Sequence, residues 1–383
     1  MLTPIKHKGI NWIGGMDISE DQMIDMDNYY IDSFRDIVAL QLTDYNYGLL
    51  PPYKGESLSS DFDITNHITN HVEVILRRCN AITAAGCRID INPVDSSEYL
   101  TMEHSFEDAA GSEGAAQWDV ILVVKPFSRI PVGEPNPEET PPRRPYVSKE
   151  YELKIMPSGG SRFDHAAVNH IIIGKVIKDN DQYVVDSSYI PPCTSINSNP
   201  ELIEYHRQFG KCFNIIELSA QKIIQKVQEH PKPSDIAKNV NFLCEKLLTH
   251  IGIVYFDYRN KNMYLPPIDT IGCCSSLAHI CYSSLTFIRK KEREELLKYF
   301  YEWSDVTPGN FDILLSSMLE MTYNHGNIRA IMEKTKYFMT VLSGLWIKLS
   351  ALEYIGQHKE NIVVAEQSEQ QDIPQKKGWS LVD

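Results

Sequence analysis

The sequence predicts an α+β fold, with a β-sandwich first and a helical bundle after it. Short β-branched and apolar runs of strand length recur up to residue 186. After the segment 186–198, apolar residues recur at helical spacing instead. The last long helix carries a heptad repeat, which is typical of bundle seams. These observations predict a β-sandwich domain over 1–197, a helical bundle over 198–356 and a flexible polar tail over 357–383.

Four segments of the first half have the composition of strands. The stretch 70–93 holds two short β-rich runs. The run 117–127 is continuously apolar, and 146–157 alternates as a half-buried strand does. The stretch 170–186 is a predicted hairpin, because Asp179–Asp181 tolerate turn geometry between two β-branched runs.

The segment 128–148 holds six prolines. Proline has no backbone N–H and cannot donate to a sheet ladder, so we expect an extended, exposed loop. Two interpretations stay open: the loop is a flexible tip, or it is an arm that docks onto a partner.

The second half is predicted to be helical. The segment 199–230 forms one long helix, because Asn199 can cap it and Pro200 suits its first position. We expect three more helices before the last one, over 234–258 with Ser234 as the cap, over about 270–303, and from near Asn310 to about 322.

The last helix, 327–354, carries the strongest pattern. Its apolar residues are spaced three and four apart over four heptads, which is a coiled-coil seam. The seam leaves two readings open, the core of a monomeric bundle or a contact between subunits. We predict that these residues form the bundle or trimer seam: Ile328, Ile331, Phe338, Leu342, Leu345, Leu349 and Leu352.

The charge of the chain excludes several function classes. Its net charge is −14, and an acidic protein is repelled by nucleic-acid phosphates and by anionic lipids. The stretch 337–355 is apolar, but Lys348 and Glu353 interrupt it, and each charge at membrane depth costs about 2.5–3.5 kcal/mol. The start of the chain has no apolar signal-peptide core. We therefore expect neither nucleic-acid binding nor direct membrane insertion.

Residues with catalytic chemistry are few and poorly grouped. The eight cysteines contain no CxxC pair, so we expect small buried thiols. His67 and His71 lack the rest of a zinc motif, and no nucleotide-binding loop or nucleophile elbow is present. We predict no catalytic residue, no metal and no cofactor. The rival hypothesis is a metal-dependent enzyme that uses Asp164, His165 and His170.

Two groups of motifs in the chain form a recognisable pattern. The first group opens the chain: Trp12, Gly15, Met16, Ile18, Gln22, Asp27 and Tyr29, followed by Tyr-Gly-Leu at 47–49. The second lies at the change from strands to helices: Asp186, Tyr189, Ile190, Pro191, Pro192, Ser198 and Leu202. Together these motifs resemble the TssK family, the baseplate subunit of bacterial type VI secretion systems. A weaker similarity covers 266–287, so the resemblance spans about residues 10–300.

The resemblance implies a trimeric connector in a contractile machine. It implies a β-sandwich shell joined to a helical neck at Asp186–Pro192, homotrimers, and attachment of the shell to the TssF–TssG wedge. It also implies a cytoplasmic protein docked at the inner face of the inner membrane. Typical members carry a further head domain that contacts the membrane complex. Here the chain ends in a heptad helix and a tail, like the short Bacteroidota form, so the membrane-side anchor stays unidentified.

The opening residues have two interpretations. Glycines let the chain turn sharply, so Trp12, Gly15 and Met16 fit an arm that anchors to a wedge subunit or a neighbouring shell. Alternatively, Trp12 covers the sandwich core of its own chain. For the whole protein, the alternative within the same class is a phage-type tail adaptor or receptor-binding protein.

Overall fold

The structure, a computed structural model, describes residues 2–67, 70–106, 117–159, 169–180, 182–304 and 306–359. These residues form two compact units. The first comprises the described residues up to 207 together with 259–271 and 322–333, and the second comprises 208–258, 272–321 and the described residues from 334 to 359.

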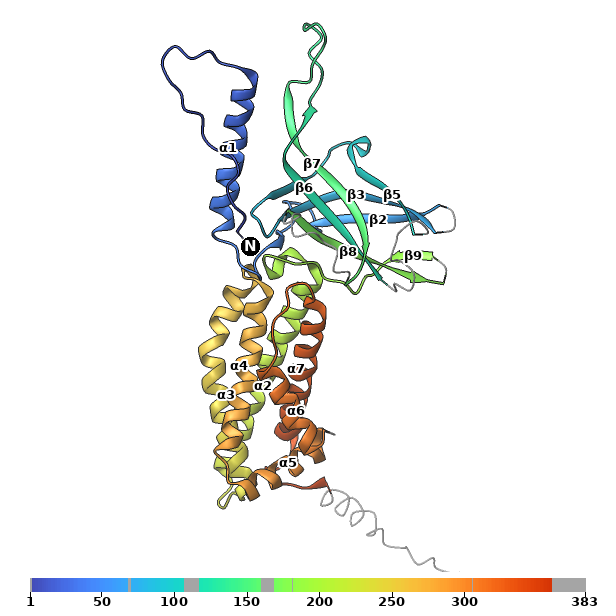
Figure 1. The fold of residues 1–383 in the computed structure, drawn as a ribbon. Helices are drawn as coiled ribbons and strands as arrows, with labels where there is room; N and C mark the ends of the chain where they lie inside the picture. Colours follow the sequence, from blue (N-terminus) through green and yellow to red (C-terminus); the bar gives the residue numbers. More distant parts are fainter. Residues whose placement is uncertain are drawn as a thin grey trace, which may run out of the picture. The chain divides into compact units, whose positions relative to one another are not determined.

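The first unit contains two antiparallel sheets (Figure 1). In the first sheet, the long strand β3 is central and pairs with all four others. Along one side it pairs with β2 and β1, and along the other with β4 and β5. The strands are β1 (Gly48–Leu49), β2 (Ser60–Asn66), β3 (His71–Ile82), β4 (Arg88–Ile91) and β5 (Leu100–Ser105).

The second sheet has the order β7-β6-β8-β9. Aromatic contacts join the two sheets into a sandwich: Phe106, which follows β5, stacks on Tyr183 of β9 at 3.7 Å between ring centroids. A Cβ on Gly174 of β8 would lie 2.2 Å from the ring of Phe62 on β2, so only glycine fits there. The strands are β6 (Gln117–Val132), β7 (Tyr146–Pro157), β8 (His170–Asp179) and β9 (Gln182–Val185).

The strand predictions hold where the pattern is long. The predicted segments match β3 with β4, β6, β7, and the β8–β9 hairpin. Strands β2 and β5 were not foreseen, because SDFDITN and LTMEHS are mostly polar and half-exposed. Strands β6 and β7 also extend into the proline-rich segment, where Ile130 pairs with Ser148 and Val132 with Tyr146, so that their connection is 133–145.

The helices begin and end mostly where their caps predict. The Asn199 side chain accepts from the Glu201 backbone N–H at 2.8 Å, and Ser234 accepts from Ala237 at 3.2 Å. The α-helices are α1 (Glu20–Ala39), α2 (Pro200–Glu229), α3 (Asp235–Asn260), α4 (Pro267–Thr286), α5 (Lys290–Ser304), α6 (Pro308–Leu319) and α7 (Ile328–Ala351), and the short 3₁₀ helices are η1 (Ser96–Glu98), η2 (Ile196–Ser198) and η3 (Asn262–Tyr264).

One helix prediction was wrong: the expected third helix is two, α4 and α5. The Phe287 N–H turns back to Ser284 O, and Ile288 is buried just after the turn. No glycine or proline marks this break, so nothing local signals it. The short helix α6 is capped by Thr307, which accepts from Asn310 N at 3.3 Å, so it begins two residues before Asn310.

The second unit is a helical bundle with an aromatic core. Phe213 packs against Tyr258, and Phe300 lies 5.9 Å from Trp346 and 5.7 Å from Phe311 between centroids. Strands in two sheets thus precede a bundle of long helices, which confirms the predicted α+β class. No helix among the described residues is long and apolar enough to cross a membrane.

Candidate functional site

Helix α1, in the first unit, turns its polar side to the protein and its apolar side to solvent. A capping box between Ser19 and Gln22 begins the helix. Its buried residues are Asn28, Asp32, Arg35 and Ala39. Five large apolar side chains on it are 47–66% exposed, and we call them the α1 stripe: Met23, Tyr30, Phe34, Ile37 and Leu40. Such an arrangement is the reverse of a core-facing helix.

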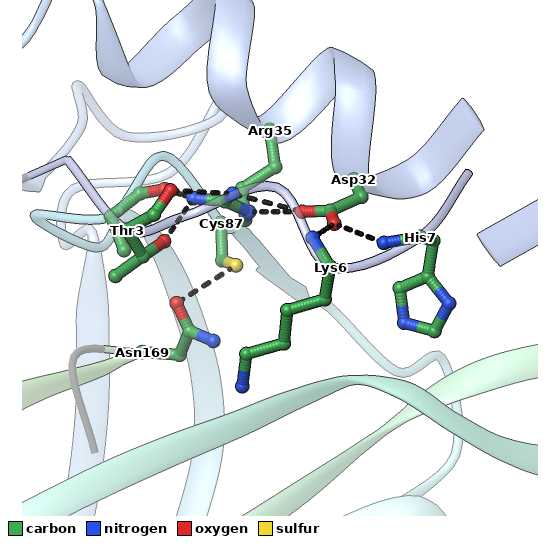
Figure 2. Close-up of polar contacts among 8 residues, drawn as sticks. Thr3, Lys6, His7, Asp32, Arg35, Cys87 and Asn169 are labelled. Carbon is green, nitrogen blue, oxygen red and sulfur yellow. Dashed lines mark hydrogen bonds and ion pairs between the residues drawn. The ribbon is translucent and has the colours of Figure 1, made fainter. Parts of the chain in front are cut away.

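A buried ion pair holds the N-terminal arm, residues 2–18, against α1 (Figure 2). Arg35 and Asp32 lie 2.8 Å apart, with both side chains at most 5% exposed. Asp32 also accepts from the backbone N–H groups of Lys6 at 2.6 Å and His7 at 3.1 Å. Burial alone raises the pKa of Asp32, but the hydrogen bonds from His7, Lys6 and Arg35 outweigh it and hold that pKa below its ordinary value.

Arg35 also joins α1 to the first sheet. Its guanidinium donates to Thr3 Oγ1 at 2.5 Å and to Ala85 O, in the β3–β4 turn, at 3.1 Å. In the same turn, Gly86 has φ +86°, and a Cβ there would lie 2.4 Å from Arg35 O. The close approach and the positive φ both require glycine. Helix α1 is therefore fastened to the sandwich through polar contacts.

The arm runs antiparallel to α1 and turns at its far end, as Figure 1 shows. The Met16 N–H donates to Ile13 O at 3.3 Å, and Gly15 adopts φ +80° in this turn. Trp12 is 46% exposed and Ile13 65%, while Met16 is half-buried. The predicted arm residues Trp12, Gly15 and Met16 thus lie together at an exposed tip.

The arm and the start of α1 are acidic. No lysine or arginine occurs between Lys8 and Arg35, although six carboxylates do. Asp32 pairs with Arg35, and Asp27 with Arg129 of β6 at 3.0 Å. Within the described part of the chain no ion pair engages the other four, which are all exposed: Asp17, Glu20, Asp21 and Asp25.

The two groups of motifs behind the resemblance meet in the first unit. The Leu49 N–H donates to Pro192 O at 2.7 Å, and a Cβ on Gly48 would lie 2.1 Å from that oxygen. The Tyr47 carbonyl accepts from His325 Nε2 at 2.8 Å. Burial lowers the pKa of His325 below its ordinary value, although the hydrogen bond that its ring donates to Tyr47 O acts in the opposite direction. Tyr-Gly-Leu at 47–49 therefore packs on the predicted junction.

The other junction residues are also well fixed. Asp186 accepts from the Gln117 side chain at 2.7 Å, Ile190 is 1% exposed, and Pro191 and Pro192 are buried. Burial raises the pKa of Tyr189 well above its ordinary value, so its hydroxyl stays protonated.

Arg329, at the start of α7, ties this junction to the start of α2. It donates to Ser188 O at 2.6 Å and to the Tyr205 hydroxyl at 2.9 Å, and it pairs with Glu201 of α2. Neither this residue nor the Asp32–Arg35 pair stands out in the sequence, because single charged residues on helices usually face solvent.

The seven predicted seam residues are all at most 7% exposed in the chain by itself: Ile328, Ile331, Phe338, Leu342, Leu345, Leu349 and Leu352. Their side chains are thus occupied by intrachain packing.

The metal-site hypothesis gains no support. Asp164 and His165 lie outside the described residues, whereas His170 begins β8. No cluster of three potential metal ligands occurs among the residues that the structure describes. Cys274 is buried, which raises its pKa well above the ordinary value, so this thiol is poorly reactive.

Comparison by sequence identifies no relative: no family model and no curated protein matches the chain. Comparison by structure does. A crystal structure of TssK matches with a TM-score of 0.51 and 14% identity, covering 88% of this chain and 69% of the other. TssK from the type VI secretion system of EAEC, in complex with a nanobody, matches with a TM-score of 0.50 and 13% identity, covering 87% and 100%. The chain therefore has the fold of TssK.

Proposed function

We propose that this chain is a structural baseplate subunit of a type VI secretion system. In this role it is a homotrimeric, non-catalytic connector between a TssF–TssG wedge and a membrane-side anchor. The observation that carries the proposal is the likeness of fold to two TssK structures over 87–88% of the chain. Further support comes from the packing of Gly48 and Leu49 on Pro192, which brings together the two groups of motifs in which the sequence resembles that family.

The proposed wedge contact is the arm. Trp12 is 46% exposed at the tip, which supports an anchor for a partner over a side chain that covers the core of its own chain. The proposed site of action is the cytoplasm, at the inner face of the inner membrane. The anchor on the membrane side has no assigned identity.

The wedge contact is tested by mixing the purified chain with TssF and TssG from the same genome. The wild-type chain is expected to co-elute with the wedge on a sizing column. Trp12→Ala is expected to weaken this complex by about ten-fold or more, as loss of an aromatic anchor does, without changing the melting temperature. A folded wild-type chain that does not bind the wedge would refute the proposal, and unfolding of Trp12→Ala would assign Trp12 to the core.

The trimer is tested by light scattering on a sizing column. The expected mass is three times the 43.8 kDa of the chain. Because the α7 seam is buried within one chain, Leu342→Ala is expected to reduce stability rather than to dissociate the trimer selectively. A monomer at all concentrations would contradict the homotrimer.

A further inference from the structure

We propose that the α1 stripe is the docking surface for a basic amphipathic helix of a partner protein. The partner's apolar side chains would cover Met23, Tyr30, Phe34, Ile37 and Leu40, and its lysines or arginines would lie beside Asp17 and Glu20. The inference rests on the proposed function in one respect, that the natural partner belongs to the wedge.

The chain cannot cover the stripe by rotating α1. Rotation would carry the Asp32–Arg35 pair away from its partners, breaking the hydrogen bonds of Asp32 to Lys6 and His7 and those of Arg35 to Thr3 and Ala85. It would also move the Arg35 backbone away from Gly86, which fits closely against it. Removing the hydrogen-bond partners of buried charged groups is strongly unfavourable. The stripe is therefore held towards solvent, and an apolar surface held exposed in this way marks an interaction site.

The spacing of the stripe selects a helical partner. Met23, Tyr30, Phe34 and Ile37 are seven, four and three residues apart, which places them in one line along the helix. That spacing is the heptad spacing, which lets a second helix pack lengthwise with its side chains between them. Leu40 widens the line at the end of α1.

The charge of the surface selects a basic partner. Four exposed carboxylates without an ion pair among the described residues lie at Asp17, Glu20, Asp21 and Asp25. Packing α1 against α1 of a second copy would bring these like charges together, and an anionic lipid surface would be repelled by them. A partner with lysine or arginine at the matching end satisfies both the apolar and the acidic part of the surface.

The test uses the full chain and two synthetic helical peptides of the same 20-residue length as α1. Both carry leucine at heptad spacing, one with lysine and the other with glutamate at the remaining charged positions. Fluorescence anisotropy is expected to show the lysine peptide binding about ten-fold or more tightly than the glutamate peptide. The preference is expected to shrink between about 50 and 500 mM salt, because screening weakens exposed charge pairs.

Variants locate the binding. Phe34→Asp is expected to weaken lysine-peptide binding about ten-fold or more. The double variant Asp17→Lys with Glu20→Lys is expected to abolish the preference between the peptides, because two lysines then lie beside the two remaining carboxylates. The matched control is Phe287→Asp, because Phe287 is 77% exposed and Phe34 66%, and it is expected to change nothing. Circular dichroism checks that each variant folds.

Absence of lysine-peptide binding, equal binding of both peptides, or equal loss in Phe34→Asp and Phe287→Asp would overturn the inference. A parallel titration with TssF–TssG separates it from the proposed function. If the peptide binds at the stripe and the wedge does not bind, the surface chemistry stands and the proposed function fails. If the wedge binds and the lysine peptide does not, the proposed function stands and this inference fails.

Discussion

Helices α1 and α7 carry apolar residues at the same heptad spacing, yet the protein places them in opposite environments. Phe338 of α7 is completely buried, whereas Phe34 of α1 is 66% exposed. On α1 the buried positions are taken by Asp32 and Arg35, which satisfy each other's charge and hydrogen bonds. On α7 the buried seam is apolar except at Thr335. A heptad therefore identifies a helix and its apolar side, but not whether that side contacts the same chain.

The largest effect expected from this comparison is on stability. Phe338→Ala should lower the free energy of unfolding by about 3–5 kcal/mol, because it removes a fully buried ring and leaves a cavity. Phe34→Ala should change it by less than about 0.5 kcal/mol, because its ring is mainly solvated. Urea unfolding measures both. Similar losses in the two variants would remove the contrast between the helices.

The next effect is local to α1. Arg35→Ala should weaken the attachment of the arm and α1 by about 3 kcal/mol, because it leaves the buried Asp32 carboxylate without its cation. Amide hydrogen exchange in peptides covering 2–40 should accelerate strongly. Peptides from α7 should keep their wild-type exchange rates.

A double variant provides the control for this prediction. Asp32→Ala together with Arg35→Ala removes both charges, so its α1 should be more protected from exchange than in Arg35→Ala alone. Equal exchange in the single and double variants would mean that the ion pair does not hold the arm.

The smallest effect is a dependence on pH. The folded pKa of Asp32 lies below its unfolded value of about 3.9, so its contribution to stability is complete above that pH and is lost as the pH falls through the folded pKa. Exchange in 2–40, corrected for the intrinsic rate, should therefore rise in acid before exchange in α7 does. Arg35 and the buried Cys87 thiol are titratable groups close to Asp32.

In Asp32→Asn this acid step should disappear, since no carboxylate remains to be protonated. Glu150, Glu152 and Asp235 also have lowered pKa values, so the global unfolding curve mixes several groups and only the local measurement tests Asp32. A step that persists in Asp32→Asn would assign it to another residue.

The elements that the sequence predicted are those with strong local signals. Helix α2 begins at Asn199 and Pro200 as expected, and β7 has the predicted bounds. The strands β2 and β5 were missed because their environment, half-exposed beside β3, allows polar residues. Of the arm and the α1 stripe, the sequence predicted only the tip of the arm, at Trp12, Gly15 and Met16, as a contact surface. The Asp32–Arg35 pair was not predicted. Arg35 binds Thr3 and Ala85, which are distant in the sequence, and a local pattern gives no information about such contacts.

The sequence by itself determined the fold class and the main long helices and strands, because hydrophobic period and capping act within a few residues. Only the tertiary structure decided which side of each helix is buried. That choice depends on partners far apart in the chain. Arg35 packs against Gly86 and donates to Ala85 O. The segment Tyr47–Leu49 contacts Pro192 through the Leu49 N–H, and the α7 seam is buried within the chain. Which side of a helix is buried depends on the hydrogen bonds that its polar groups can form and on the apolar area that is buried over the whole unit. On α1 the ion pair is therefore buried and the stripe is exposed.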